Sequence, residues 1–345
     1  MIGAKMKKLA KYWEKGPGED QVKCILCPRE CVVSPGDLGY CRARKNIDGD
    51  LYSMVYGEVI SANPDPIEKK PLYHFHPGSR IFSVSTVGCN FECKHCQNWR
   101  ISQSSTEEMD TVVIEPEEAV EKAKRSNCQG IAFTYGEPVI WFEYGLETSK
   151  LAKEEDLYTV YVTNGYMNLD AWKEIGPYLD AMNVDMKAFN DEFYREVCGV
   201  PSVKPVLDTC EWAVDNGIHL ELTNLIIPDE NDDPDQIREL CRWIAKDLNP
   251  DVPIHFSRFH PMYKMSGKPS TPVETIEMAL EIAEEEGLNY VYVGNVPGHR
   301  SDNTYCPECG KLLIKRSGFS ISEYNLEDAR CPKCGKETGI VEGKP

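Results

Sequence analysis

Three closely spaced cysteines are the residues of this sequence with the clearest capacity for chemistry. Cys89, Cys93 and Cys96 follow the pattern C-x3-C-x2-C directly after an apolar run over 81–87, and no fourth cysteine lies near them in the sequence. Four thiolates would complete the coordination of a zinc ion or a [4Fe-4S] cluster. Three thiolates leave one metal position open, and an open position is where a reacting molecule can bind. The alternative is a structural zinc knuckle whose fourth ligand comes from elsewhere in the chain.

A second group of cysteines lies in the first fifty residues. Cys24, Cys27, Cys31 and Cys41 have the spacing C-x2-C-x3-C-x9-C. Four thiolates can surround one metal centre, and zinc and an auxiliary [4Fe-4S] cluster both accept such a ligand set. The spacing does not choose between a zinc staple for a small module and a cluster that relays electrons or faces the substrate.

A third group lies near the end of the chain. Cys306, Cys309, Cys331 and Cys334 form two C-P-x-C-G knuckles, in which the glycine permits the tight turn around the metal. Paired knuckles predict a zinc-ribbon or rubredoxin-like module that binds zinc or iron. The remaining cysteines are expected to be buried and without a role in chemistry: Cys128, Cys198, Cys210 and Cys241.

Length, composition and charge limit the function classes. The chain has 345 residues, 15 of them cysteine, and a formal net charge of -18. Many cysteines without an apolar signal segment favour metal sites in a cytoplasmic protein over disulfides. The acidic balance disfavours nucleic acid as a partner, because it repels phosphates. No apolar run approaches the roughly 20 residues of a membrane span, so no membrane partner is expected.

The elements that must position these cysteines alternate along the middle of the chain. Strands are predicted over 82–87, 130–134, 158–163, 179–187, 219–227, 253–259 and 290–293. Helices are predicted between them, among others over 116–125, 141–154, 234–246 and 272–286. Such alternation of strands and helices predicts an α/β fold with a parallel sheet.

Several of these strands carry one polar face, whereas fully buried parallel strands are almost entirely apolar. The polar faces consist of Thr159, Tyr161 and Thr163, of Asn183, Asp185 and Lys187, and of His219, Glu221 and Thr223. Helices must cover the apolar faces, so we expect the polar faces to line a lumen that holds a ligand. A closed eight-stranded barrel would have apolar layers there, so the pattern favours an open, incomplete barrel.

The stretch 88–98 resembles the signature of the radical S-adenosylmethionine (SAM) enzymes. In that superfamily three cysteines hold a [4Fe-4S] cluster, and its open iron binds SAM and cleaves it to a 5'-deoxyadenosyl radical. The resemblance implies that Cys89, Cys93 and Cys96 bind the cluster, within a partial (β/α)6 TIM-like barrel. The predicted organisation is an N-terminal four-cysteine module (1–50), a connecting segment (51–80), a radical SAM core (81–300) and a C-terminal zinc-ribbon or rubredoxin-like module (301–345).

Further motifs of this resemblance imply residues that bind SAM. Gly136 and Glu137 match the second half of the family's G-G-E-P motif, with Tyr135 in place of the first glycine, and Glu137 would accept the ammonium group of SAM. Thr163 and Asn164 resemble the T-N-G motif of the glycyl-radical-enzyme activases. Those activases carry an aspartate of a cation site just before this motif.

This chain has Val162 in place of that aspartate, which puts the cation site in doubt. Asp185 and Lys187 match a D-x-K motif in which the lysine pairs with the SAM carboxylate, although an ordinary ion pair at a strand end is the alternative. His260 lies where the activases carry a histidine that contacts SAM, and a purely structural histidine is the alternative. Thr223 and Leu225 are further candidates for the ribose and adenine wall.

Over nearly its whole length the chain resembles the AmmeMemoRadiSam-system proteins, relatives of pyruvate formate-lyase activating enzyme. The supporting stretches are 65–75, 88–98, 292–296 and the two outer cysteine groups. The resemblance implies that the enzyme abstracts hydrogen from a substrate, for which a protein is one candidate. It also implies two partners, a low-potential electron donor and a Memo-type protein. A glycyl-radical activase is one alternative, and a non-catalytic iron–sulfur or zinc scaffold is another. The intact cysteine loop together with Glu137 and Lys187 argues against the scaffold.

Overall fold

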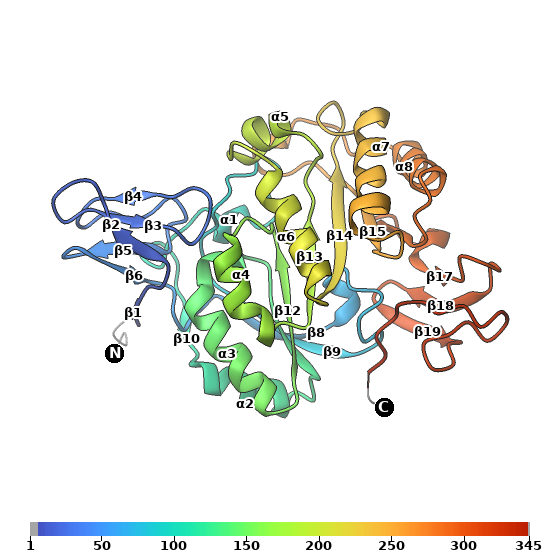
Figure 1. Cartoon of the computed structure of the whole chain (residues 1–345), viewed down its shortest axis with the longest axis horizontal. Helices are drawn as coiled ribbons and strands as arrows, with labels where there is room; N and C mark the ends of the chain where they lie inside the picture. Colours follow the sequence, from blue (N-terminus) through green and yellow to red (C-terminus); the bar gives the residue numbers. More distant parts are fainter. Residues whose placement is uncertain (1–5, 344–345) are drawn as a thin grey trace.

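The computed structural model describes residues 6–343, and its centre is a sheet of eight strands (Figure 1). Seven of these strands pair in parallel, and β8 pairs antiparallel with β9. Strands β8 and β16 form the two edges, so the sheet is open. In sheet order the strands are β16 (Val291–Gly294), β15 (Ile254–Arg258), β14 (His219–Ile226), β13 (Ala181–Asp185), β12 (Tyr158–Thr163), β11 (Gly130–Phe133), β9 (Arg80–Ser85) and β8 (Ser61–Pro66).

All seven strands predicted from the sequence are present, and each lies within two residues of its predicted ends. The antiparallel strand β8 lies in the connecting segment and was not predicted, because its alternation of proline and polar residues does not indicate a strand. The predicted α/β fold with a mostly parallel, incomplete barrel is therefore confirmed.

Helices follow the strands and cover the outer face of the sheet (Figure 1). Proline begins α2 and α7, where a missing N–H does no harm, and the Asp233 side chain caps α7 by accepting from the N–H groups of Asp235 and Gln236. The longer helices are α2 (Pro116–Arg125), α3 (Phe142–Glu154), α4 (Leu169–Ile175), α6 (Lys204–Asp215), α7 (Pro234–Trp243) and α8 (Val273–Glu285). Shorter helical turns are α1 (Trp99–Ser102), η1 (Ile67–Lys69), η2 (Pro138–Trp141), α5 (Asp191–Phe193), η4 (Tyr194–Cys198) and η5 (Ile244–Leu248).

The inner face of the sheet wraps around a segment of the chain itself, residues 67–76, which we call the lumen segment. The backbone N–H groups of Tyr73 and His74 donate to the Glu221 carboxylate of β14 at 3.0 and 2.7 Å. The Asn183 side chain of β13 donates to the Pro71 carbonyl at 2.8 Å. Some polar side chains of the lumen therefore hydrogen-bond to the backbone of the lumen segment, so fewer of them are available to a ligand.

The predicted orientation of strand β12 is wrong. Val160 faces the lumen, where it packs with the apolar residues Ile67 and Leu72 of the lumen segment. Tyr161 points outward and packs against Trp172 of α4, with ring centroids 6.0 Å apart. The apolar side of this strand faces inward because an apolar stretch of chain fills the lumen at this depth. In β13 and β14 the polar residues do face inward, as predicted.

Two small modules flank the sheet at opposite ends of the molecule (Figure 1). The N-terminal module contains two three-stranded sheets: β1 (Lys8–Leu9), β6 (Asp50–Ser53) and β5 (Arg44–Ile47), and β2 (Trp13–Lys15), β3 (Val22–Cys24) and β4 (Val32–Val33). The C-terminal module contains β17 (Thr304–Tyr305), β18 (Leu312–Ser317) and β19 (Ser320–Tyr324). Within residues 6–343, no helix is long and apolar enough to cross a membrane.

Candidate active site

A cavity of about 730 Å³ lies at the carboxyl ends of the parallel strands. The three cysteines of the central motif line it, together with Glu137 and Lys187. Barrel enzymes place their reactive groups at this end, because loops from several strands meet there. The structure therefore brings the cysteine motif and the predicted SAM-binding motifs to one place.

The cysteines lie in a loop between β9 and α1, where Cys93 is buried and Cys89 and Cys96 are partly buried. Burial raises the pKa values of the Cys89 and Cys96 thiols. The Phe91 N–H group donates to the Cys89 sulfur at 3.3 Å, and the Ser102 hydroxyl lies 3.3 Å from the Cys96 sulfur. These donors favour thiolates, which are the form that binds metal.

Glu137 follows β11 and is buried at the wall of the cavity. Its carboxylate accepts from the Thr163 hydroxyl at 2.5 Å and from the Asn164 N–H group at 2.8 Å. Burial raises the pKa of Glu137 to about 7, although these hydrogen bonds oppose the shift. Beside it, a Cβ atom on Gly136 would lie 2.6 Å from the Thr86 carbonyl, so only glycine fits there.

Tyr135 occupies the position of the motif's first glycine and has a left-handed φ of 63°. Its hydroxyl donates to Asp65 at 2.6 Å, and the buried Lys70 ammonium lies 3.1 Å from the same hydroxyl and 2.9 Å from Asp65. Burial lowers the pKa of Lys70 to about 8. This network, absent from the sequence-based predictions, holds a bulky residue in a conformation that usually favours glycine.

Asp185 and Lys187 lie at the end of β13, and their charged atoms are 2.8 Å apart. Burial works against the Lys187 charge, but the neighbouring Asp185 carboxylate outweighs it and raises the lysine's pKa. Lys187 therefore stays cationic in a site where few other cations are present. It is placed to pair with a carboxylate in the cavity.

The comparisons with known proteins agree with this geometry. The family model described as the Radical SAM superfamily matches residues 83–244. An uncharacterized protein of Methanocaldococcus jannaschii is 47% identical over 334 residues, which cover 96% of this chain and 99% of that relative. The chain contains a radical SAM superfamily domain.

More distant relatives extend this result. Pyruvate formate-lyase 1-activating enzyme of Escherichia coli (strain K12) is 23% identical over 234 residues, which cover 63% of this chain and 93% of that enzyme. This radical SAM chain is thus related to the activating enzymes. Among solved structures, SuiB of Streptococcus suis bound to S-adenosylmethionine has a TM-score of 0.50 and 11% identity, covering 70% of this chain and 57% of that one, which shows a shared fold.

The radical SAM superfamily implies a [4Fe-4S] cluster and SAM, and the residues of the cavity fit both. Three cysteine sulfurs, of which that of Cys93 is buried, provide the incomplete ligand set that such a cluster needs. Glu137 and Lys187 offer an acceptor and a cation to the amino and carboxylate groups of an amino acid, and all of these residues line the same cavity. Their charges match those of a bound methionine moiety.

His260 does not reach this radical SAM site. It is exposed, and its ring lies 3.2 Å from the Ser270 hydroxyl outside the residues that line the cavity. The Thr271 hydroxyl binds the N–H group of Phe259 at 3.1 Å and turns the chain away from the cavity directly after β15. His255, one of the inward-facing residues of β15, lines the cavity instead, as do the predicted candidates Thr223 and Leu225.

His95 is a cavity residue that the sequence analysis passed over. It lies between Cys93 and Cys96 in the sequence, it is 3% exposed, and neither ring nitrogen has a hydrogen-bond partner among the described residues. Burial lowers the pKa of His95 to about 3, so the ring is neutral. The one feature of the sequence that points to His95 is its position between Cys93 and Cys96.

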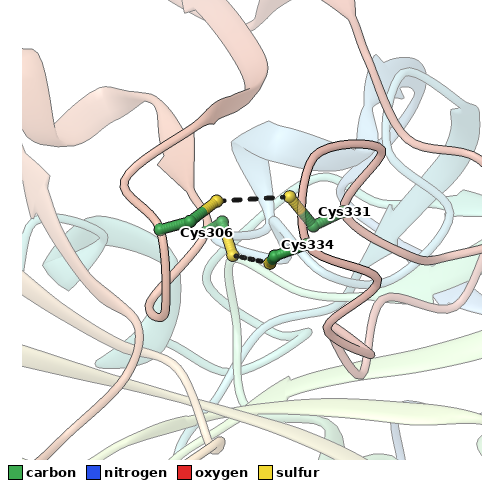
Figure 2. Close-up of side chains that lie close together, drawn as sticks. Cys306, Cys331 and Cys334 are labelled. Carbon is green, nitrogen blue, oxygen red and sulfur yellow. Dashed lines mark hydrogen bonds between the residues drawn. The ribbon is translucent and has the colours of Figure 1, made fainter.

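The four C-terminal cysteines form a compact group that could hold a metal ion (Figure 2). The sulfurs of Cys306 and Cys334 are 3.5 Å apart, and those of Cys309 and Cys331 are 3.6 Å apart. All four sulfurs lie within 4.8 Å of one another. Tetrahedral zinc with bonds of about 2.3 Å would separate its sulfurs by roughly 3.8 Å, so this group has the dimensions of a mononuclear site.

Proposed function

We propose that this protein is a radical SAM enzyme that binds a [4Fe-4S] cluster through Cys89, Cys93 and Cys96. When bound, the cluster and SAM would supply a 5'-deoxyadenosyl radical, which abstracts hydrogen from a substrate. The observation that carries the proposal is the convergence of three cysteines, the Glu137 carboxylate and the Lys187 ammonium on one cavity.

The chain's own residues would bind and orient SAM. Glu137 is fixed on both oxygens by Thr163 and Asn164, so it presents a rigid acceptor to the ammonium group. Asn164 also donates to Asn90 at 2.8 Å, which ties this acceptor to the cysteine loop. Lys187 would hold the carboxylate group from the opposite side. Fixed geometry of this kind lowers the cost of positioning the reacting atoms.

The substrate side of the cavity is formed by parts of the chain outside the parallel strands. Lys69 of the lumen segment, the loop 295–298 after β16 and the hairpin turn 317–319 of the C-terminal module all line the cavity. At this turn the Phe319 side chain is 51% exposed. An exposed aromatic residue at a cavity rim suits contact with a peptide segment, and the relation to activating enzymes favours a protein substrate.

A glycyl-radical-enzyme activase is the second candidate, favoured by the relatives named as pyruvate formate-lyase activating enzymes. Val162 lines the cavity where the activase motif has an aspartate, and this difference weighs against it. A Memo-type protein stays a proposed partner.

The test is anaerobic reconstitution with iron and sulfide, followed by SAM and dithionite, with 5'-deoxyadenosine measured by mass spectrometry. We expect the product from the unaltered protein and none from Cys96→Ala. Cys128→Ala is the matched control, since Cys128 is a buried single cysteine outside the cavity lining. Product formation by Cys96→Ala would contradict the assignment. A reducible cluster that yields no product with any tested substrate would favour the scaffold.

A further inference from the structure

The four N-terminal cysteines surround one small cavity of their own. Cys24 ends β3, Cys31 precedes β4, and all four side chains line the same space together with Arg44. The Cys24 N–H group donates to the Cys31 carbonyl at 2.9 Å, which holds the backbone of these two cysteines together. The structure thus brings these four cysteines around one space.

The dimensions of this group differ from those of the C-terminal one. Among residues 6–343, the C-terminal cysteines are the one group of potential metal ligands whose ligand atoms all lie within 4.8 Å of one another, and neither the N-terminal nor the central cysteines meet this criterion. In a [4Fe-4S] cluster each cysteine binds a different iron, so its sulfurs stand farther apart than those around one zinc ion.

A buried cation faces this group. Arg44 is 1% exposed, its guanidinium donates to the Cys24 sulfur at 3.9 Å, and it pairs with Glu143 at 2.6 Å. The Arg44 Nε atom has no hydrogen-bond partner in the described part of the chain. A buried arginine with an unused donor beside four sulfurs suits an anionic centre that fills the cavity.

The N-terminal group also touches the loop of the central cysteines. A Cβ atom on Gly88 would lie 2.5 Å from the Cys41 carbonyl, and Gly88 directly precedes Cys89. Asn90, the next residue after Cys89, lines the N-terminal cavity, and its carbonyl accepts from the Arg29 side chain at 2.5 Å. One layer of backbone therefore separates the two cysteine sites.

We propose that Cys24, Cys27, Cys31 and Cys41 bind an auxiliary [4Fe-4S] cluster that relays electrons to the cluster at Cys89, Cys93 and Cys96. A low-potential, one-electron donor protein is oxidised by one electron, and the auxiliary cluster takes up that electron. The auxiliary cluster then returns to its oxidised state as the second cluster is reduced. The relay role rests on the proposed function, whereas the metal assignment does not. Cys27 and Cys31 are partly exposed, which gives a donor access from the outside.

The metal assignment is tested in the triple variant Cys89→Ala/Cys93→Ala/Cys96→Ala, which removes the central ligands. After anaerobic reconstitution we expect about four iron and four sulfide per chain, and a reduced-cluster signal in electron paramagnetic resonance. Adding Cys27→Ala and Cys31→Ala should abolish both. Zinc without sulfide at this site, or no metal at all, would overturn the assignment. Because no SAM cleavage is measured, this outcome is independent of the proposed function.

The relay is tested in Cys31→Ser with the central cysteines intact. We compare the rate of 5'-deoxyadenosine formation driven by a reduced ferredoxin with the rate driven by dithionite, a small reductant that does not need the relay. The ratio of the two rates should fall at least tenfold relative to the unaltered protein. An unchanged ratio, in a variant shown by circular dichroism to be folded and by metal analysis to have lost the auxiliary iron, would reject the relay.

Discussion

Glu137 is a buried carboxylate that must be ionised to bind a cation, and its pKa of about 7 makes that state depend on pH. Below pH 7 the protonated form accepts an ammonium group poorly, so SAM affinity should fall about tenfold per pH unit. Glu137→Gln should weaken SAM binding at pH 8 by about tenfold or more and remove this dependence. Equilibrium binding under anaerobic conditions measures both effects.

The control for this prediction is Glu118→Gln, because Glu118 lies on the outward face of α2 and its side chain is about half exposed. Its affinity for SAM and its pH profile should match those of the unaltered protein. If Glu137→Gln retained a steep rise in affinity between pH 6 and 8, the titrating group would be another residue.

At the scale of residues, the sequence predicts the cavity-lining residues that belong to short motifs and misses those whose position depends on the path of the chain. The central cysteines, Glu137 and Lys187 are found because short motifs place them at strand ends. His260 is misplaced because the turn after β15 depends on a contact with Thr271, which is remote in sequence. His255 lines the cavity, but no local sequence pattern marks it.

At the scale of elements, local patterns predict the strands but do not predict what fills the lumen. The pattern of apolar and polar residues that marks a strand lies within the strand's own sequence, so the sequence predicts all seven parallel strands. The lumen segment is held by contacts such as that between Tyr73 and Glu221, which are 148 residues apart. The same segment explains the orientation of β12, because its apolar residues Ile67 and Leu72 pack against Val160.

The lumen segment should make the fold sensitive to acid. Burial lowers the pKa of His74 to about 3, so the unfolded chain binds a proton near pH 6.5 that the folded chain rejects. The stability that this group contributes is present above pH 6.5 and is lost at about 1.4 kcal/mol per pH unit as the pH falls. Chemical denaturation at pH 7 and pH 5 should therefore differ by about 2 kcal/mol from His74 alone.

Glu221 adds a second loss at lower pH. Burial disfavours its charge, but hydrogen bonds from His219 and His255 outweigh that effect and hold the pKa of Glu221 well below its usual value. Its contribution is present above about pH 4.3 and is lost as the pH falls below that. His74→Gln should flatten the change between pH 7 and 5, whereas the exposed control His260→Asn should leave it intact. Equal slopes in these two variants would rule out the lumen segment as the source.

The contact between the N-terminal module and the cysteine loop gives a further prediction. Gly88 has a φ of 95° and no room for a Cβ atom, whereas Gly217 has a φ of 71° and nothing within 4 Å. Gly217→Ala should cost about 1 kcal/mol from the backbone alone. Gly88→Ala should cost about 2–4 kcal/mol, because the Cys41 carbonyl must also move. Denaturant titration compares the two, and equal losses would show that the modules can separate freely.

At the scale of the whole molecule, a buried arginine links the C-terminal module to the lumen segment, beside the backbone hydrogen bonds that Val341 makes with His74 and His76. Arg316 of β18 donates to the Tyr73 carbonyl at 2.8 Å and to the Thr304 hydroxyl at 2.8 Å. Its guanidinium also lies 4.2 Å from the centre of the Tyr73 ring. The sequence predicts this module from its knuckles, but the link to the lumen segment depends on residues more than 200 positions apart in the chain.

A metal ion in the C-terminal module should therefore support the substrate side of the cavity without taking part in SAM cleavage. The module's apolar core is small, with Leu313, Ile314 and Ile340 as its buried aliphatic residues, so metal binding should supply much of its stability. Cys309→Ala should release zinc, make the chain after residue 303 sensitive to limited proteolysis, and lower the melting temperature. Arg316→Lys keeps the metal ligands and should loosen the link to Tyr73 while zinc stays bound.

These two variants separate the module's stability from its effect on the cavity. In Cys309→Ala the turn 317–319 loses its support, so turnover of a substrate should fall. Dithionite-driven SAM cleavage without substrate should change less than about twofold, because the central cysteines and Glu137 belong to other elements. In Arg316→Lys a smaller effect of the same kind is expected with full zinc content. If Cys309→Ala kept its resistance to proteolysis but altered the redox behaviour of the protein, the metal at this site would be an electron carrier and not a structural ion.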